Sequence, residues 1–118
     1  MSDSDNTEDG IGYSKLVNKS MHNIIYQALK IAETDGLPGD HHFYISFLTQ
    51  SPGVKISKKL IEKYPSEMTI VIQYQFENLK VTKSKIAITL SFDGVSESLE
   101  VPYSSIISFA DPSADFGL

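Results

Sequence analysis

The sequence predicts an α+β domain that is mainly β: a small antiparallel β-barrel or sandwich with one N-terminal helix. Two patterns carry this prediction. Apolar residues recur at the 3.6-residue helical spacing between residues 14 and 35, and from His41 onward they alternate with polar residues at the period of a strand. Five or six short strands joined by tight turns then indicate a small barrel or sandwich.

The helix is expected over residues 14–35. Ser14 fits the N-cap, and Gly36 stands where a left-handed C-terminal cap is expected, followed by Leu-Pro-Gly, which stops the helix. Its apolar stripe is wider than one sheet face requires. Either the helix is deeply packed, or it packs on the sheet and also on a second subunit. For the second case we expect a homodimer interface at Met21, Ile25, Ala28 and Leu29.

The chain is expected to form one domain over residues 13–118, preceded by a disordered acidic tail over residues 1–12. Within the domain, the strands occupy about residues 41–110. A short helical piece capped by Ser57 ends before Pro65, and Asp93-Gly94 is a strong hairpin signal. Further strands are predicted at residues 43–47, 68–76, 79–81, 86–92, 99–101 and 106–109.

Two of these strands carry a polar stripe on one face. Successive strand side chains point to opposite faces, so each strand has a core face and an open face. The expected core residues are Met68, Ile70, Ile72, Tyr74, Ile86, Ile88, Leu90 and Phe92, with Phe43, Phe47 and Phe109 from other strands. The open faces carry amide and hydroxyl groups, which can hydrogen-bond an extended peptide without a large cost of charge desolvation.

No arrangement of residues predicts catalysis or a cofactor. The chain has no cysteine, which excludes a disulfide framework, cysteine-ligated zinc and thiol catalysis. His41 and His42 are adjacent, so on a strand they point opposite ways, and a metal site is not expected. No nucleophile motif or glycine-rich phosphate loop occurs. We therefore expect no enzyme activity, catalytic residue, metal or cofactor.

The charge and hydropathy of the chain argue against several classes of binding partner. The net charge of −5 argues against non-specific nucleic-acid binding, and no DNA partner is expected. The longest apolar run is too short to span a bilayer, so no membrane partner is expected. The acidic, polar start of the chain is the opposite of a signal peptide, and a cytoplasmic location is expected.

Several segments resemble one known family. GLPGDHHFYISF, SPGVKIS, KYPSEMTIVIQYQFENL, ITLSFDG and VPYSSIISFADPSADFGL occur here in order, and they cover nearly everything from Gly36 to Leu118. They are similar to stringent starvation protein B, SspB, in its alpha-proteobacterial form. The resemblance implies an adaptor that binds the tag added to stalled translation products by the tmRNA system and delivers tagged proteins to the ClpXP protease. It also implies an Sm-like or SH3-like β-barrel whose N-terminal helix is used in dimerisation.

Carried onto this sequence, the resemblance places a peptide-binding groove on the open strand faces. Gln73 matches a polar tag-contacting position of the family, whereas Ser91 stands where better-known relatives carry Arg. Phe76 could line the groove mouth or plug the end of the core. The expected peptide-binding residues are Val71, Gln73, Gln75, Phe76, Thr89 and Ser91.

The family also continues past its folded body as a linker that ends in a motif docking on ClpX. This chain stops at Leu118 with no such tail. For these residues alone, the expectation is therefore that tags are bound but delivered poorly, because a tether acts by raising local concentration.

Two other functions remain open at this stage. One is an Sm-like RNA-binding module, which aromatic stacking and a basic surface would support. The other is a structural dimerisation domain without a peptide ligand.

Overall fold

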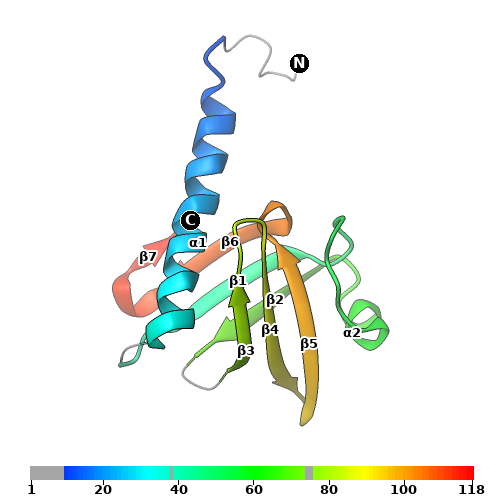
Figure 1. The fold of residues 1–118 in the computed structure, drawn as a ribbon. Coiled ribbons are helices and arrows are strands. Elements are labelled where there is room, and N and C mark those ends of the chain that lie inside the picture. The colour runs from blue at the N-terminus through cyan, green and yellow to red at the C-terminus, as the bar shows by residue number, and fades with distance from the viewer. Residues whose placement is uncertain (1–9, 38, 74–75) are drawn as a thin grey trace.

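Two antiparallel sheets and a long helix make up the part of the chain that the structure describes (Figure 1). The structure is a computed structural model and describes residues 10–37, 39–73 and 76–118. The helix α1 covers Tyr13–Asp35, and a short helix α2 covers Lys58–Lys63. The α+β, mainly β prediction is confirmed.

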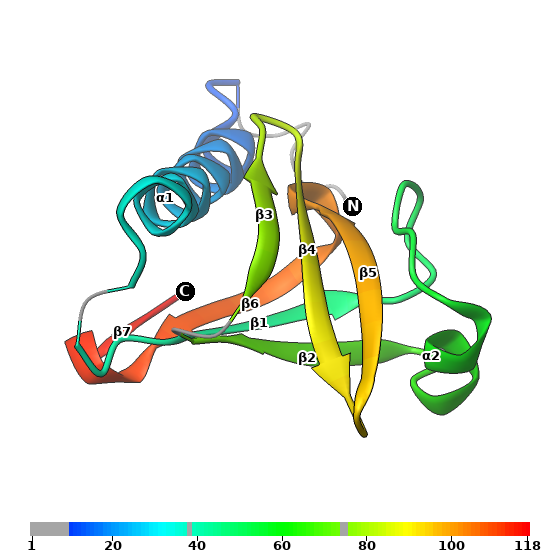
Figure 2. The ribbon, with the colours of Figure 1, turned by 60° about the horizontal axis from the view of Figure 1, so that its bottom comes forward.

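The first sheet has the order β2-β1-β6-β7 and the second β3-β4-β5. Figure 2 shows that the strands of the two sheets cross, with α1 lying along one side. No pairing among the described strands joins the two sheets into a closed barrel, so the sandwich alternative describes them better. The strands are β1 Phe43–Leu48, β2 Glu67–Ile72, β3 Glu77–Val81, β4 Lys85–Phe92, β5 Val95–Pro102, β6 Ile106–Asp111 and β7 Phe116–Gly117.

The core lies between the two sheets and under α1. Period-two alternation puts every second residue of β2 and of the first half of β4 inside, as the sequence predicts. Leu90 and Phe92 are only half-buried, because β4 runs out past the body of the sandwich. The fully buried side chains include Leu29, Ile45, Phe47, Ile70, Ile72, Ile86, Ile88, Leu99, Val101 and Phe109.

Helix α1 begins one residue earlier than expected, and the N-cap prediction is wrong. Gly12, with φ 80° and ψ 45°, occupies the N-cap, and no side chain caps the helix there. At the other end the Gly36 N–H donates to the Ala32 carbonyl at 2.9 Å. Gly36 has the expected positive φ of 76°, but its ψ of 174° is not that of a left-handed helical cap. The N-terminal half of α1 projects beyond the sheets (Figure 1).

The turns that frame the candidate site follow their sequence signals. Asp93 and Gly94 have φ values of 51° and 79°, the pattern of a type I′ hairpin turn between β4 and β5. Ser57 accepts a hydrogen bond from the Leu60 N–H and caps α2, as predicted. Strand β2 is described only as far as Ile72. The predictions for residues 1–9, Pro38, Tyr74 and Gln75 lie outside the described residues.

Candidate functional site

An open pocket of about 470 Å³ lies where β3 begins beside β4. Hydroxyl groups form much of its wall, with apolar surface from two further side chains. Its lining residues are Phe76, Glu77, Thr89, Leu90, Ser91 and Ser96.

Strand register brings these residues together. Glu77 pairs with Thr89 across β3 and β4, and Ser91 pairs with Ser96 across β4 and β5. Cross-strand partners project from the same face of a sheet, so these side chains share the outer face of β3-β4-β5. The tight Asp93-Gly94 turn fixes the pairing of Ser91 with Ser96, because a hairpin's register follows from its turn.

The pocket is polar but nearly uncharged. Glu77 is the only ionisable residue in its lining, which contains no cation. The Thr89 hydroxyl lies 3.5 Å from the Asn78 amide nitrogen and 3.4 Å from the Ser98 hydroxyl. These distances are at the limit for hydrogen bonds, so the Thr89 hydroxyl remains available to a ligand.

The edge of β2 offers a second feature suited to an extended ligand. Ser66 accepts a hydrogen bond from the Thr49 N–H, so the even-numbered residues of β2 direct their backbone groups toward β1. Thr69 and Val71 therefore direct their backbone groups to the other side, where no described strand pairs with β2. Such an edge is a template for one more strand.

The structure gathers part of the predicted peptide site. Phe76, Thr89 and Ser91 line the same pocket. Val71 is half-buried on β2, where it pairs with Tyr44 of β1 in the first sheet, and Gln73 is exposed just after β2. Neither residue lines the pocket. Gln75 lies outside the described residues. Peptide contact stays a prediction for all six residues.

Three lining residues were not predicted. Ser96 could have been found by pairing it with Ser91 across the Asp-Gly turn. Leu90 was assigned to the core from its alternation; it packs against the core, but it is only half-buried and also lines the pocket. Glu77 is the first residue of β3, whereas the strand predicted in this segment begins at residue 79.

The family model for stringent starvation protein B matches residues 15–118. The chain belongs to the stringent starvation protein B family. Membership of the SspB family gives this chain a general role as a proteolytic adaptor that acts on protein partners; the family is not one of known enzymes. No curated protein sequence matches the chain. No described helix of this SspB-family chain is long and apolar enough to cross a membrane.

The helix surface corrects the expected dimer face of this SspB-family chain. Ile25 and Leu29 are 2% and 0% exposed, so the expectation that they face outward is wrong: both pack in the core of a single chain. The large apolar residues exposed on α1 are Tyr13, Leu16, Val17, Ile24 and Ile31. Three of them, Val17, Ile24 and Ile31, recur every seven positions. Met21 and Ala28 are half-buried and fall between them. We call Val17, Met21, Ile24, Ala28 and Ile31 the α1 stripe.

His41 and His42 make contacts within the fold. His41 lies 2.8 Å from Asp111, whose side chain is almost buried at the end of β6. Burial raises the pKa of the Asp111 carboxyl, but hydrogen bonds from His41 and Ser113 outweigh it and hold that pKa below its ordinary value. The His42 ring lies against Tyr44. Across residues 10–37, 39–73 and 76–118, no three His, Asp or Glu side chains gather as a metal site.

Proposed function

We propose that this chain binds the degradation tag of the tmRNA system as an extended peptide and delivers tagged proteins to ClpXP. The observation that carries peptide binding is the pocket lined by Phe76, Thr89 and Ser91. Phe76 follows Ile72, the last residue of β2, after only a few positions of the chain. Membership of the stringent starvation protein B family supports the adaptor role.

The pocket and the strand edge supply complementary contacts. The unpaired backbone of Thr69 and Val71 can hydrogen-bond the main chain of a peptide, as when a strand is added to a sheet. The hydroxyls of Thr89 and Ser91 can accept hydrogen bonds from the backbone of the bound peptide or donate hydrogen bonds to it. Phe76 offers apolar surface to a small side chain of that peptide. Because Glu77 is the only ionisable residue in the lining, binding a peptide there requires little desolvation of charge.

Gln73 fits this proposal through its place in the chain. It lies between the open edge of β2 and Phe76, the pocket residue that precedes β3, and its side chain is exposed. An amide there can donate to and accept from one peptide unit of a passing strand. We therefore keep Gln73 as a peptide-contacting residue.

The adaptor is proposed to act as a homodimer through the α1 stripe. The exposed members Val17, Ile24 and Ile31 lie seven residues apart, and Met21 and Ala28 fill the intervening positions of a heptad pattern. Two copies of α1 can pack along such a seam. Dimerisation would cover apolar side chains that a single chain leaves in water.

The test is fluorescence anisotropy with a labelled tag peptide and the full chain. Ser91→Trp places a bulky ring in the pocket, and we expect it to weaken binding by about tenfold or more, equivalent to ~1.4 kcal/mol or more. Ser104→Trp, at an exposed serine outside the pocket lining, is the matched control and should bind as the parent does. Equal affinities for all three proteins would refute the pocket as the peptide site.

The same assay separates the remaining functions. A structural dimerisation domain gives no anisotropy change with the tag peptide at any concentration. An RNA-binding module binds a labelled oligoribonucleotide more tightly than the peptide, with an affinity that falls steeply as salt rises.

A further inference from the structure

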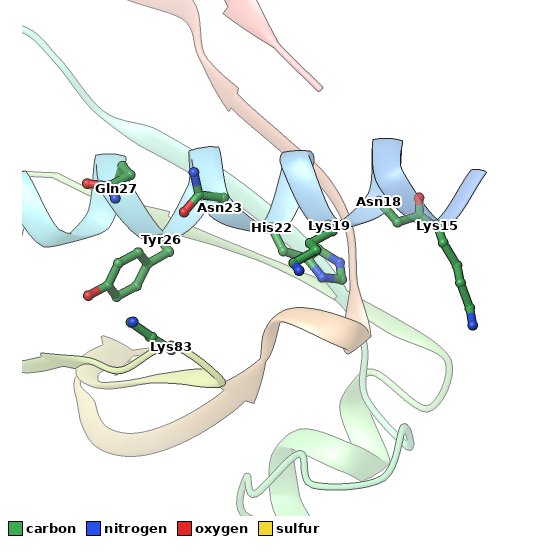
Figure 3. A pocket seen from close by; sticks show the side chains of 8 residues that line it. All are labelled: Lys15, Asn18, Lys19, His22, Asn23, Tyr26, Gln27 and Lys83. Atoms are coloured by element: carbon green, nitrogen blue, oxygen red, sulfur yellow. The ribbon is translucent and has the colours of Figure 1, made fainter. Parts of the chain in front are cut away.

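A second hollow, of about 610 Å³, lies between α1 and the turn that joins β3 to β4 (Figure 3). One wall is a face of α1 that runs from Lys15 to Gln27, and the other wall contains Lys83 from the turn. In Figure 3 Tyr26 and Lys83 point toward one another across the hollow. We call this hollow the α1 groove.

The α1 groove is positively charged on an acidic protein. Its lining contains Lys15, Lys19 and Lys83 and no carboxylate, although the whole chain carries a net charge of −5. Lys30, Lys63 and Lys85 are paired with carboxylates. Lys55, Lys58, Lys59 and Lys80 are, like the groove lysines, in no ion pair of the described residues, but none of them lines the α1 groove. No ion pair of the described residues involves the three groove lysines. Their charge is therefore left for a ligand.

The shape of the α1 groove suits an extended peptide. At 1.5 Å per residue, the helix wall from Lys15 to Gln27 is about 18 Å long, which an extended segment of about five residues would span. Lys15 and Lys19 are one turn apart, about 6 Å along the axis. Alternate side chains of an extended peptide are about 6.7 Å apart on one face, so two alternating carboxylates match this pair of lysines.

Uncharged groups in the lining fit the same ligand. Asn23 and Gln27 carry amides that can both donate to and accept from a peptide main chain. A long nucleic acid is less suited, because its charge would extend past the three lysines along a chain whose net charge is −5.

The α1 groove is separate from the sites already described. It shares no lining residue with the pocket at Ser91, and β4 runs between them from Lys85 to Phe92. The α1 stripe lies on another face of the helix, because its members Val17, Ile24 and Ile31 line no part of the groove. A dimer formed through the stripe can therefore leave the groove open.

We propose that the α1 groove binds an acidic peptide segment of the proteins that this adaptor delivers. The inference rests on the proposed function for the source of the segment. It adds a second contact on the delivered chain, with lysine ammonium groups pairing with alternating carboxylates.

The test uses the full chain and a fluorescein-labelled decapeptide of alternating Glu and Ser, measured by anisotropy at low salt. We expect Lys19→Gln with Lys83→Gln to weaken binding by about tenfold, since two charge-assisted contacts are lost. The matched control, Lys58→Gln with Lys59→Gln, makes the same charge change on α2 and should stay within about twofold, because these exposed lysines lie outside the groove. Replacing Glu by Gln in the peptide should abolish binding.

Several results would overturn the inference. Equal weakening by both lysine pairs would show attraction to net charge alone. Loss of binding in Ser91→Trp would place the acidic peptide in the pocket beside β4, and tighter binding of a decauridylate would make the groove a nucleic-acid site. If the parent chain binds the Glu-Ser peptide but no tag, the proposed function fails while the acidic-peptide site stands.

Discussion

Glu33 on α1 accepts a hydrogen bond at 2.7 Å from the backbone N–H of Val81, the last residue of β3. Strand β3 is an edge strand, and the Lys30 ammonium donates to the Val81 carbonyl at 3.3 Å. Lys30 and Glu33 are themselves paired at 2.7 Å. One helix turn thus supplies a donor and an acceptor to the backbone of one edge residue, which joins α1 to the second sheet by polar contacts as well as by packing.

Glu33→Gln should loosen the end of α1 from β3. The hydrogen bonds from Lys30 and then from the Val81 N–H hold the pKa of the Glu33 carboxyl below its ordinary 4.5. A lowered pKa gives stability that is present above that value and is lost as pH falls through the folded-state pKa. We expect a smaller protection factor against hydrogen exchange at the Val81 amide in the variant, and in the parent chain as pH falls from 4.5 through the folded-state pKa of Glu33. Glu62→Gln, an exposed change on α2, is the control, and unchanged exchange in Glu33→Gln would contradict this role.

Ile24→Glu and Ile25→Glu should affect different properties, dimerisation and fold stability, although the residues are adjacent. Ile24 is 40% exposed and Ile25 is 2% exposed. We expect Ile24→Glu to give a folded monomer, and Ile25→Glu to destabilise the fold by more than about 3 kcal/mol because it buries an unpaired charge. Analytical ultracentrifugation and thermal unfolding measure the two effects. A parent chain that is monomeric at micromolar concentration would rule out the α1 dimer.

Gln73→Ala should weaken binding of the tag peptide by about 1–3 kcal/mol, the value of one or two hydrogen bonds, while the protein stays folded. Ile72→Ala, at the preceding and fully buried position, should cost about 2–5 kcal/mol of unfolding free energy. Anisotropy and urea unfolding on both variants check this pair. A Gln73→Ala protein with parental affinity would remove Gln73 from the site.

Asp111→Asn should destabilise the junction between β6 and the segment before β1, by about 1–3 kcal/mol at neutral pH, since a buried hydrogen-bonded carboxylate is lost. The lowered pKa of Asp111 means that its contribution is present above the ordinary 3.8 and fades as pH falls through the folded value. Urea unfolding between pH 7 and pH 3 should therefore show the difference between parent and variant shrinking toward acid. A difference that stays constant with pH would contradict the carboxylate's role.

Local pattern predicted much of the fold. Alternation identified the buried faces of β1 and β2, and the Asp93-Gly94 signal identified the hairpin whose register sets Ser91 opposite Ser96. Ser57 gave the start of α2. These features depend on residues that are near one another in the chain, so a single sequence contains enough information to predict them.

The candidate site was predicted only in part, since it depends on contacts between distant residues. Thr89 and Ser91 follow from alternation along one strand. Thr89 lies beside Glu77 because β3 pairs with β4, whereas Val71 belongs to the other sheet. Where Val71 lies relative to Thr89 depends on the angle at which the two sheets cross, and the sequence pattern does not contain that angle.

Helix α1 shows the same difference between what local sequence determines and what tertiary packing decides. Its sequence determined the length of the helix and an apolar surface too wide for one sheet. The tertiary structure decided which of its apolar residues are buried. Ile25, Leu29 and Ala32 face the sheets, whereas Ile24 and Ile31 are exposed. The physical reason is that periodicity gives the relative angles of side chains around a helix, whereas the face that is buried is selected by the shape of the surface on which the helix packs.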